Sequence, residues 1–195
     1  MNSAEARSTD VILRAAFQLT PEELRVAYRL ENHSRSVLAV YDGAGTPAPD
    51  DTESWPDLTE NVYLSFQEPA TLHLKRIRPP LPEDEDITFV NIPVASRLEP
   101  GAVRRTRFAL KLPLSEFNEY YPDYPGAQWA ERTATEVQLW IGYFRATPET
   151  EFQPLPDAPH IFSLGGQFGE QEFVTARQAL TVKVRVRTDP VFQRL

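Results

Sequence analysis

The sequence predicts an all-β protein built as an antiparallel β-sandwich, with long loops and one or two short helical turns. Three observations support this fold class. Apolar and polar residues alternate strictly over Leu180–Arg187, and a period of two puts one face of a strand in a core and the other in water. Several earlier segments repeat this alternation. The chain also has 18 prolines and only 8 glycines, which is typical of many stiff connections between short elements.

The first half of the chain contains five segments with the pattern of half-buried strands. They are Val11–Leu19, Leu24–Glu31, Val37–Tyr41, Val62–Phe66 and Thr71–Ile77. Thr20 would also suit the N-cap of a helix, but the four alternating apolar residues that follow it favour a hairpin. The acidic, proline-containing stretch Asp42–Glu60 is expected to be a long loop.

The rest of the chain contains five further strand-like segments. They are Ile87–Ala95, Val103–Leu112, Glu136–Phe144, Gln171–Ala176 and Leu180–Arg187. Leu98–Gly101 is a strong turn signal. Short helical turns are expected over Ser115–Tyr121 and Ala127–Thr133, and Thr147–Gly169 is expected to be irregular. Both faces of Glu136–Phe144 are apolar, which predicts a central strand or one that is covered on both sides.

The pattern describes one domain. About nine strands joined by proline-marked turns, without long helices between them, predict a sandwich that is immunoglobulin-like in the broad architectural sense. A chain of 195 residues is long enough for one full-sized core and short for two ordinary domains. We therefore expect a flexible N-terminal segment at 1–10, a single β-sandwich domain at 11–190 and a C-terminal tail at 191–195.

Composition excludes several classes of function. The chain has no cysteine, so disulfides, thiolate catalysis and zinc–thiolate sites are excluded. The first residues lack the apolar core of a leader, and no segment approaches about 18 uninterrupted apolar residues. We therefore expect a cytoplasmic protein without a membrane partner. The net charge of −8 argues against nucleic acid or an anionic membrane as a general partner.

Charge is distributed unevenly along the chain. No Lys or Arg lies between Ser36 and Leu74, whereas cations gather on the predicted strands, where their long stems can cover a sheet. Such strands can together form a basic sheet face that binds an acidic partner despite the net charge. The residues expected on this face are Lys75, Arg105, Arg107, Lys183 and Arg185.

The best candidate for a binding surface is an aromatic segment, Phe117–Gly126, together with Trp129. Aromatic and acidic residues are interleaved there on a proline-stiffened loop. Tyrosine provides a large contact area at a small entropic cost, and its hydroxyl accepts polar partners. The candidate binding residues are Phe117, Tyr120, Tyr121, Tyr124 and Trp129, with Glu119 and Asp123 as polar contacts. In the alternative, the same aromatics fold back and plug one open end of the sandwich.

No motif predicts catalysis, a cofactor or a metal site. The three histidines, His33, His73 and His160, lack the spacing of metal ligands and are expected to be solvated. No nucleophile elbow, phosphate-binding glycine loop or dinucleotide fingerprint is present. Arg76–Pro82 matches the pattern of a polyproline ligand of SH3 domains, but it serves equally well as a stiff link between two strands. We expect no catalytic residue, no cofactor and no metal.

The function most consistent with these patterns is a non-catalytic domain that binds another protein or a peptide. The sequence specifies neither the biological process nor the oligomeric state. The alternative is a carbohydrate-binding or glycoside-hydrolysing β-sandwich that uses the aromatic loop 117–129. A sugar site predicts exposed, coplanar rings with carboxylates on the rim. An interaction domain predicts an exposed apolar patch or an open strand edge.

Overall fold

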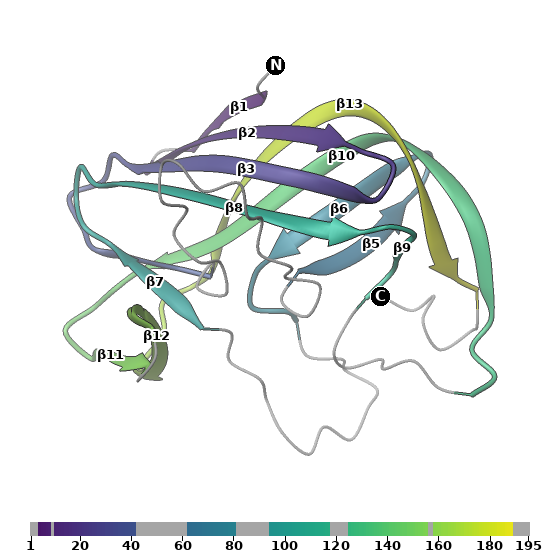
Figure 1. The fold of residues 1–195 in the computed structure, drawn as a ribbon. Helices are drawn as coiled ribbons and strands as arrows, with labels where there is room; N and C mark the ends of the chain where they lie inside the picture. The colour runs from purple at the N-terminus through teal and green to yellow at the C-terminus, as the bar shows by residue number, and fades with distance from the viewer. Residues whose placement is uncertain are drawn as a thin grey trace.

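The computed structural model describes residues 4–8, 10–41, 62–80, 94–117, 125–155 and 158–188. Every regular element in these ranges is a β-strand (Figure 1), so the predicted all-β class is confirmed. In the same ranges, no helix is long and apolar enough to cross a membrane. The strands are β1 (Ala4–Arg7), β2 (Val11–Leu19), β3 (Glu23–Asn32), β4 (Leu38–Val40), β5 (Tyr63–Gln67), β6 (Thr71–Arg76), β7 (Ala95–Leu98), β8 (Val103–Lys111), β9 (Leu114–Ser115), β10 (Trp129–Arg145), β11 (Thr150–Leu155), β12 (Ala158–Gly166) and β13 (Glu172–Arg187).

Four strands form the first sheet, in the order β1-β2-β3-β8, and all of its pairs are antiparallel. β2 and β3 form the predicted hairpin. The Thr20 hydroxyl accepts a hydrogen bond from the Glu23 amide at 3.1 Å, so Thr20 stabilises a hairpin turn and not a helix. The first ten residues, expected to be a flexible segment, include β1, which pairs with β2.

The second sheet is larger and mixed. Its strands follow the order β11-β12-β7-β4-β10-β13-β9, with β6 also paired to β10 and β5 paired to β6. β6 runs parallel to β10 and β9 runs parallel to β13, which corrects the purely antiparallel prediction. β10 has β13 along one edge, and β4 and β6 along the other, which confirms the central position predicted for Glu136–Phe144. β10 and β13 are long and strongly curved (Figure 1).

Several predicted boundaries in the second sheet are wrong. Ala127–Thr133, expected to be helical, contains the start of β10, because pairing with β13 extends this strand to Trp129. The same pairing makes the two predicted C-terminal strands, Gln171–Ala176 and Leu180–Arg187, parts of the single strand β13. Thr147–Gly169, expected to be irregular, contains the hairpin of β11 and β12.

Other expectations fall partly or wholly outside the described residues. The acidic loop Asp42–Glu60 lies wholly outside them, as does most of the predicted strand Ile87–Ala95. Ala95 begins β7, and the turn before β8 is closed by a hydrogen bond of 3.0 Å from the Ala102 amide to the Glu99 carbonyl. In the described part of Ser115–Tyr121 the chain is extended and not helical, since Ser115 ends β9.

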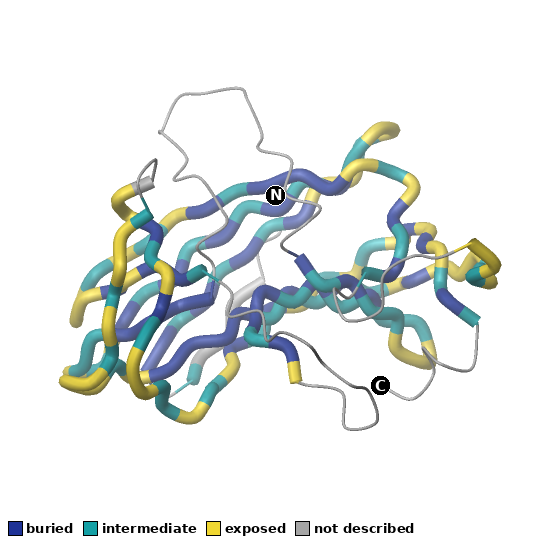
Figure 2. Tube along the Cα trace, turned by 90° about the horizontal axis from the view of Figure 1, so that it is seen from below, coloured by how far each residue is buried: buried dark blue, intermediate teal, exposed yellow. Residues whose placement is uncertain are grey.

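The main core lies between the two sheets. Buried and half-buried residues alternate strictly along β3, and the tube in Figure 2 shows dark blue alternating with teal along several strands. In β13, Val182 and Val184 are buried, while Lys183 and Arg185 are exposed, as the alternation in this segment predicts. A second, smaller hydrophobic cluster packs the β11–β12 hairpin against the rest of the second sheet. It consists of Ala39, Tyr41, Ala95, Phe144 and Leu164, with Phe152 and Phe168 packed against it.

Candidate functional site

A cleft lies where β5, β8 and β9 meet the start of β10 and the end of β13. It consists of two hollows of about 280 Å³ and about 630 Å³. Their linings share Leu64, Glu116, Phe117 and Arg187, so the two hollows are adjacent. We call them together the Glu116 cleft, after the buried carboxylate that lines both.

Glu116 fixes the relative position of the cleft walls. Its two carboxylate oxygens accept hydrogen bonds from the backbone N–H groups of Phe66, at 2.6 Å, and Arg187, at 2.8 Å. Next to it, Phe117 and Leu64 exchange a pair of backbone hydrogen bonds of 3.0 and 3.1 Å. The short segment after β9 therefore joins the edge of β5 to the end of β13.

Burial changes the ionisation of two groups in the cleft. Glu116 is only 7% exposed, and desolvation raises its pKa, although its backbone hydrogen bonds and the charges of Arg187 and Lys75 act in the opposite direction. Desolvation lowers the pKa of Lys75, and the negative charge of Glu116 counteracts that change. Glu116 and Lys75 therefore each favour the charged form of the other in a partly dehydrated site.

Aromatic rings line both hollows. The rings of Tyr63 and Phe117 are stacked, with centroids 6.2 Å apart and planes inclined by 9°. The Trp129 ring interacts with two guanidinium groups, because the Cζ atoms of Arg185 and Arg187 lie 4.9 and 5.8 Å from its centroid. These side chains are held by neighbours on different strands, so they present a largely pre-formed surface.

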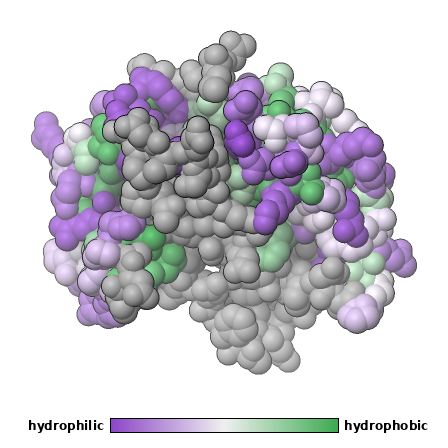
Figure 3. Space-filling model, viewed as in Figure 1, coloured by the Kyte–Doolittle hydropathy of each residue, from purple (hydrophilic) through white to green (hydrophobic). Residues whose placement is uncertain are grey.

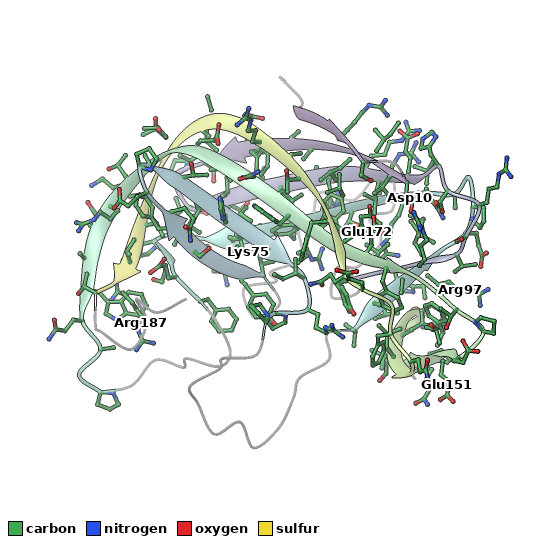
Figure 4. All side chains as sticks on the ribbon, turned by 180° about the vertical axis from the view of Figure 1, so that it is seen from behind. Asp10, Lys75, Arg97, Glu151, Glu172 and Arg187 are labelled. Carbon is green, nitrogen blue, oxygen red and sulfur yellow. The ribbon has the colours of Figure 1, made fainter. Side chains whose placement is uncertain are left out.

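The Glu116 cleft carries an excess of positive charge. Its lining includes Lys75, Lys111, Arg132, Arg185 and Arg187, against Glu68 and Glu116. Figure 4 labels two of these cations, Lys75 on β6 and Arg187 at the end of β13. The whole chain has a net charge of −8, so the cleft has the opposite sign to the molecule and attracts acidic groups locally.

The structure places two of the predicted aromatic binding residues, Phe117 and Trp129, in this cleft. The other predicted contacts, Tyr120, Tyr121, Tyr124, Glu119 and Asp123, lie outside the described residues. Sequence reasoning missed the carboxylate bridge and the neighbouring strand edge, because no local pattern indicates which segments a two-residue strand such as β9 will join. The residues that it missed include Tyr63, Arg132, Glu116 and Arg187.

The five predicted basic-face residues do not share one sheet. Arg105 and Arg107 lie on β8 in the four-stranded sheet, whereas Lys75, Lys183 and Arg185 lie on β6 and β13 in the larger sheet. Lys183 is exposed and forms an ion pair of 2.8 Å with Glu131.

No group of three or more His, Cys, Asp or Glu side chains in the described part of the chain is arranged to hold a metal ion. His33 and His160 are exposed, as expected. For His73 the expectation is wrong, because this side chain is half-buried on β6 with its ring 5.4 Å from that of Trp140. Desolvation, assisted by the charge of Lys75, lowers the pKa of His73 to about 4, so this side chain is neutral at physiological pH.

Comparisons of the chain with protein-family models, curated proteins and solved structures found no match. The class of the protein therefore rests on its own fold and site. It is an all-β, sandwich-like domain with an aromatic, cationic cleft beside the edge of β5.

Proposed function

We propose that the protein is a non-catalytic binding module that holds an extended segment of another protein in the Glu116 cleft. One observation carries this proposal: two adjoining hollows, each lined by aromatic rings and by more cations than acids, lie beside β5. Every residue of β5 lines the larger hollow, while Phe117 and Trp129 line the smaller one. Aromatic-lined grooves that take the side chains of an extended segment are a recurring arrangement in peptide recognition.

The shape of the cleft suits side chains of an extended peptide. Side chains on one face of an extended chain are about 6.6 Å apart, so neighbouring ones can enter adjacent hollows. The smaller hollow, of about 280 Å³, is below the range of about 300–1,000 Å³ that is typical of small-molecule sites. It therefore suits one apolar side chain between Leu110, Pro113 and Trp129, and an acidic neighbour can then meet Lys75 or Arg132.

The chemistry of Glu116 supports a binding role without catalysis. Both of its oxygens accept backbone hydrogen bonds, so the carboxylate serves as a bridge between strands. The carbohydrate alternative has less support in the described residues. Phe117 and Trp129 are both half-buried, and cations outnumber carboxylates in the lining of the cleft, whereas a sugar site predicts exposed rings with carboxylates on the rim.

The proposal can be tested by selecting ligands from a library of random 12-residue peptides displayed on phage. Binding of the selected peptides is then measured by fluorescence anisotropy with the unmodified protein and with Phe117→Ala and Trp129→Ala. We expect micromolar binding to the unmodified protein and a loss of about tenfold or more in each variant, because aromatic anchors supply much of the energy of such interfaces.

Phe173→Ala is the matched control. Phe173 is an aromatic residue on β13 that is 42% exposed and lies outside the lining of the cleft, so its removal should leave peptide binding unchanged. Circular dichroism and thermal melting establish that each variant is folded. The proposal is wrong if no peptide is enriched, if both cleft variants bind as well as the unmodified protein, or if a panel of oligosaccharides binds where peptides do not.

A further inference from the structure

Three arginines lie directly opposite one another on the outer face of the four-stranded sheet. The register pairs Arg14 of β2 with Arg29 of β3, and Arg29 with Arg105 of β8. Paired residues of an antiparallel ladder project to the same side, and the alternate residues on these strands are buried in the core. The three side chains therefore form one row across the outside of the sheet.

The row belongs to a larger basic face, which we define as the outward residues of β2, β3 and β8. Six cations and two acids are found among these residues. The cations are Arg14, Arg25, Arg29, Arg105, Arg107 and Lys111, and the acids are Glu23 and Glu31. The whole chain has a net charge of −8, so the rest of the molecule is more acidic than the total. On the side seen in Figure 3, hydrophilic side chains (purple) are mixed with smaller hydrophobic areas (green).

The row is unfavourable for folding. Like charges directly opposite each other on a sheet are destabilising, and one acid, Glu31, is within ion-pair distance of both Arg14 and Arg29. Desolvation acts to raise the pKa of Glu31. The contacts of Glu31 with His33, Arg29 and Arg14 have the larger combined effect, so the pKa is lowered. Glu31 therefore stays charged beside Arg14 and Arg29, and the register places a second acid, Glu5 of β1, opposite Arg14. Arg105, by contrast, lies opposite another arginine, Arg29. About two-fifths of the Arg29 side chain is exposed (41%), so this charge is accessible.

We propose that the basic face is a second binding surface, which takes a short acidic segment of another protein. Guanidinium groups match carboxylates through paired hydrogen bonds, and a row of them can hold successive acidic side chains. Lys111 also lines the Glu116 cleft, but the other five cations of the basic face, which include the whole arginine row, do not. The inference does not depend on the function proposed for that cleft.

The size of the face favours a short acidic segment over nucleic acid. Three strands about 4.8 Å apart, with nine or ten residues each, form a platform of about 10 by 30 Å. A duplex, with one charge per about 1.7 Å, would extend beyond this platform onto the acidic remainder of the molecule. None of the outward residues of β2, β3 and β8 is aromatic, so the face also lacks the rings that stack on single-stranded bases.

The test uses a fluorescein-labelled 12-residue peptide of alternating Glu and Ala, measured by anisotropy in 50 mM NaCl. We expect the unmodified protein to bind it and the double variant Arg29→Gln/Arg105→Gln to bind it at least fivefold more weakly. Binding should also weaken in 300 mM NaCl, because the contacts are exposed ion pairs. Arg29 and Arg105 are chosen because neither lines the cleft.

The control double variant, Arg177→Gln/Lys183→Gln, changes the net charge equally but at exposed positions of β13. It should bind the peptide as the unmodified protein does. The thermal midpoint of Arg29→Gln/Arg105→Gln should be unchanged or higher, since a repulsive contact is removed. Equal losses in both double variants, or no loss in either, would overturn the proposal. So would tighter binding to a 20-nucleotide DNA strand or to phosphatidylserine vesicles than to the peptide.

Discussion

Arg76 is the largest fully buried side chain among the described residues, with 1% exposure. It donates a hydrogen bond of 3.0 Å to the Tyr28 hydroxyl, and its Cζ atom lies 5.3 Å from the centroid of the Phe108 ring. Its Nε and Nη2 atoms have no hydrogen-bond partner. The period of two along β6 does separate Arg76 from its neighbour Lys75, since successive residues point to opposite faces. Arg76 is in phase with the buried residues Leu72 and Leu74. What the local pattern could not indicate is which groups, Tyr28 and Phe108, would surround the buried guanidinium.

A second buried polar group, the hydroxyl of Tyr143, makes the stability of the fold decrease at alkaline pH. It lies 2.9 Å from the Ser8 hydroxyl and donates to Glu172 at 3.1 Å. Arg145 binds Asp10 nearby, at 2.6 Å, and Figure 4 labels Asp10 and Glu172. Desolvation, together with the charges of Glu172 and Asp10, raises the pKa of Tyr143 from 10.0 to about 12.

The folded state therefore holds the Tyr143 proton more tightly than the unfolded state between pH 10 and 12. Its contribution to stability is complete below pH 10 and is lost as the pH rises through this window. We expect Tyr143→Phe to lower the free energy of unfolding by about 1 kcal/mol at pH 8, and the deficit to shrink towards pH 12. Urea unfolding at both pH values measures this. A deficit that is the same at both would contradict the assignment.

Among the elements, the sequence best predicts the strands that have one face in the core and the other face exposed to solvent. β2 begins and ends where the alternation does, and β3 and β8 differ from their predicted ranges only at the ends. The alternation fails for the outer part of β10, where Glu131, Arg132 and Thr133 are all exposed. This segment is held extended by its pairing with β13, which lies far away in the sequence. The β-propensity of the segment itself cannot predict such a pairing.

The β11–β12 hairpin gives a prediction about a single element. Gly166, at the end of β12, has φ of +74°, and a Cβ atom there would lie 1.9 Å from the Glu149 carbonyl oxygen. Gly166→Ala must therefore displace the backbone beside the hairpin, in addition to the cost of about 1 kcal/mol for a positive φ. We expect the amides of β11 and β12 to lose protection from hydrogen exchange while those of β2 and β3 keep theirs.

Gly101→Ala is the control for this substitution. Gly101 has the same φ of +74°, but a Cβ atom there would meet nothing within 4 Å. It should lower the global stability by about 1 kcal/mol without a selective effect on the hairpin. If both substitutions produced the same exchange pattern, the contact with Glu149 would have no part in holding the hairpin.

At the scale of the whole molecule, the two hydrophobic clusters predict a hierarchy of stability. The larger cluster includes buried residues from both sheets, among them Leu13, Val26, Phe108, Leu139 and Val184. The smaller cluster has five buried residues and secures the β11–β12 hairpin. Stability in proteins is not uniform, and elements with few buried apolar contacts open before the rest unfolds.

We therefore expect native-state hydrogen exchange to show two levels of protection. The paired amides of β3, β10 and β13 should exchange only through global unfolding, with an opening free energy equal to that from urea denaturation. The amides shared by β11 and β12 should exchange through a local opening of lower free energy that depends little on urea. A single opening free energy across all these strands would show that the hairpin is as firmly integrated as the main core. The binding surfaces should stay intact when the hairpin opens, because β11 and β12 line neither the Glu116 cleft nor the basic face.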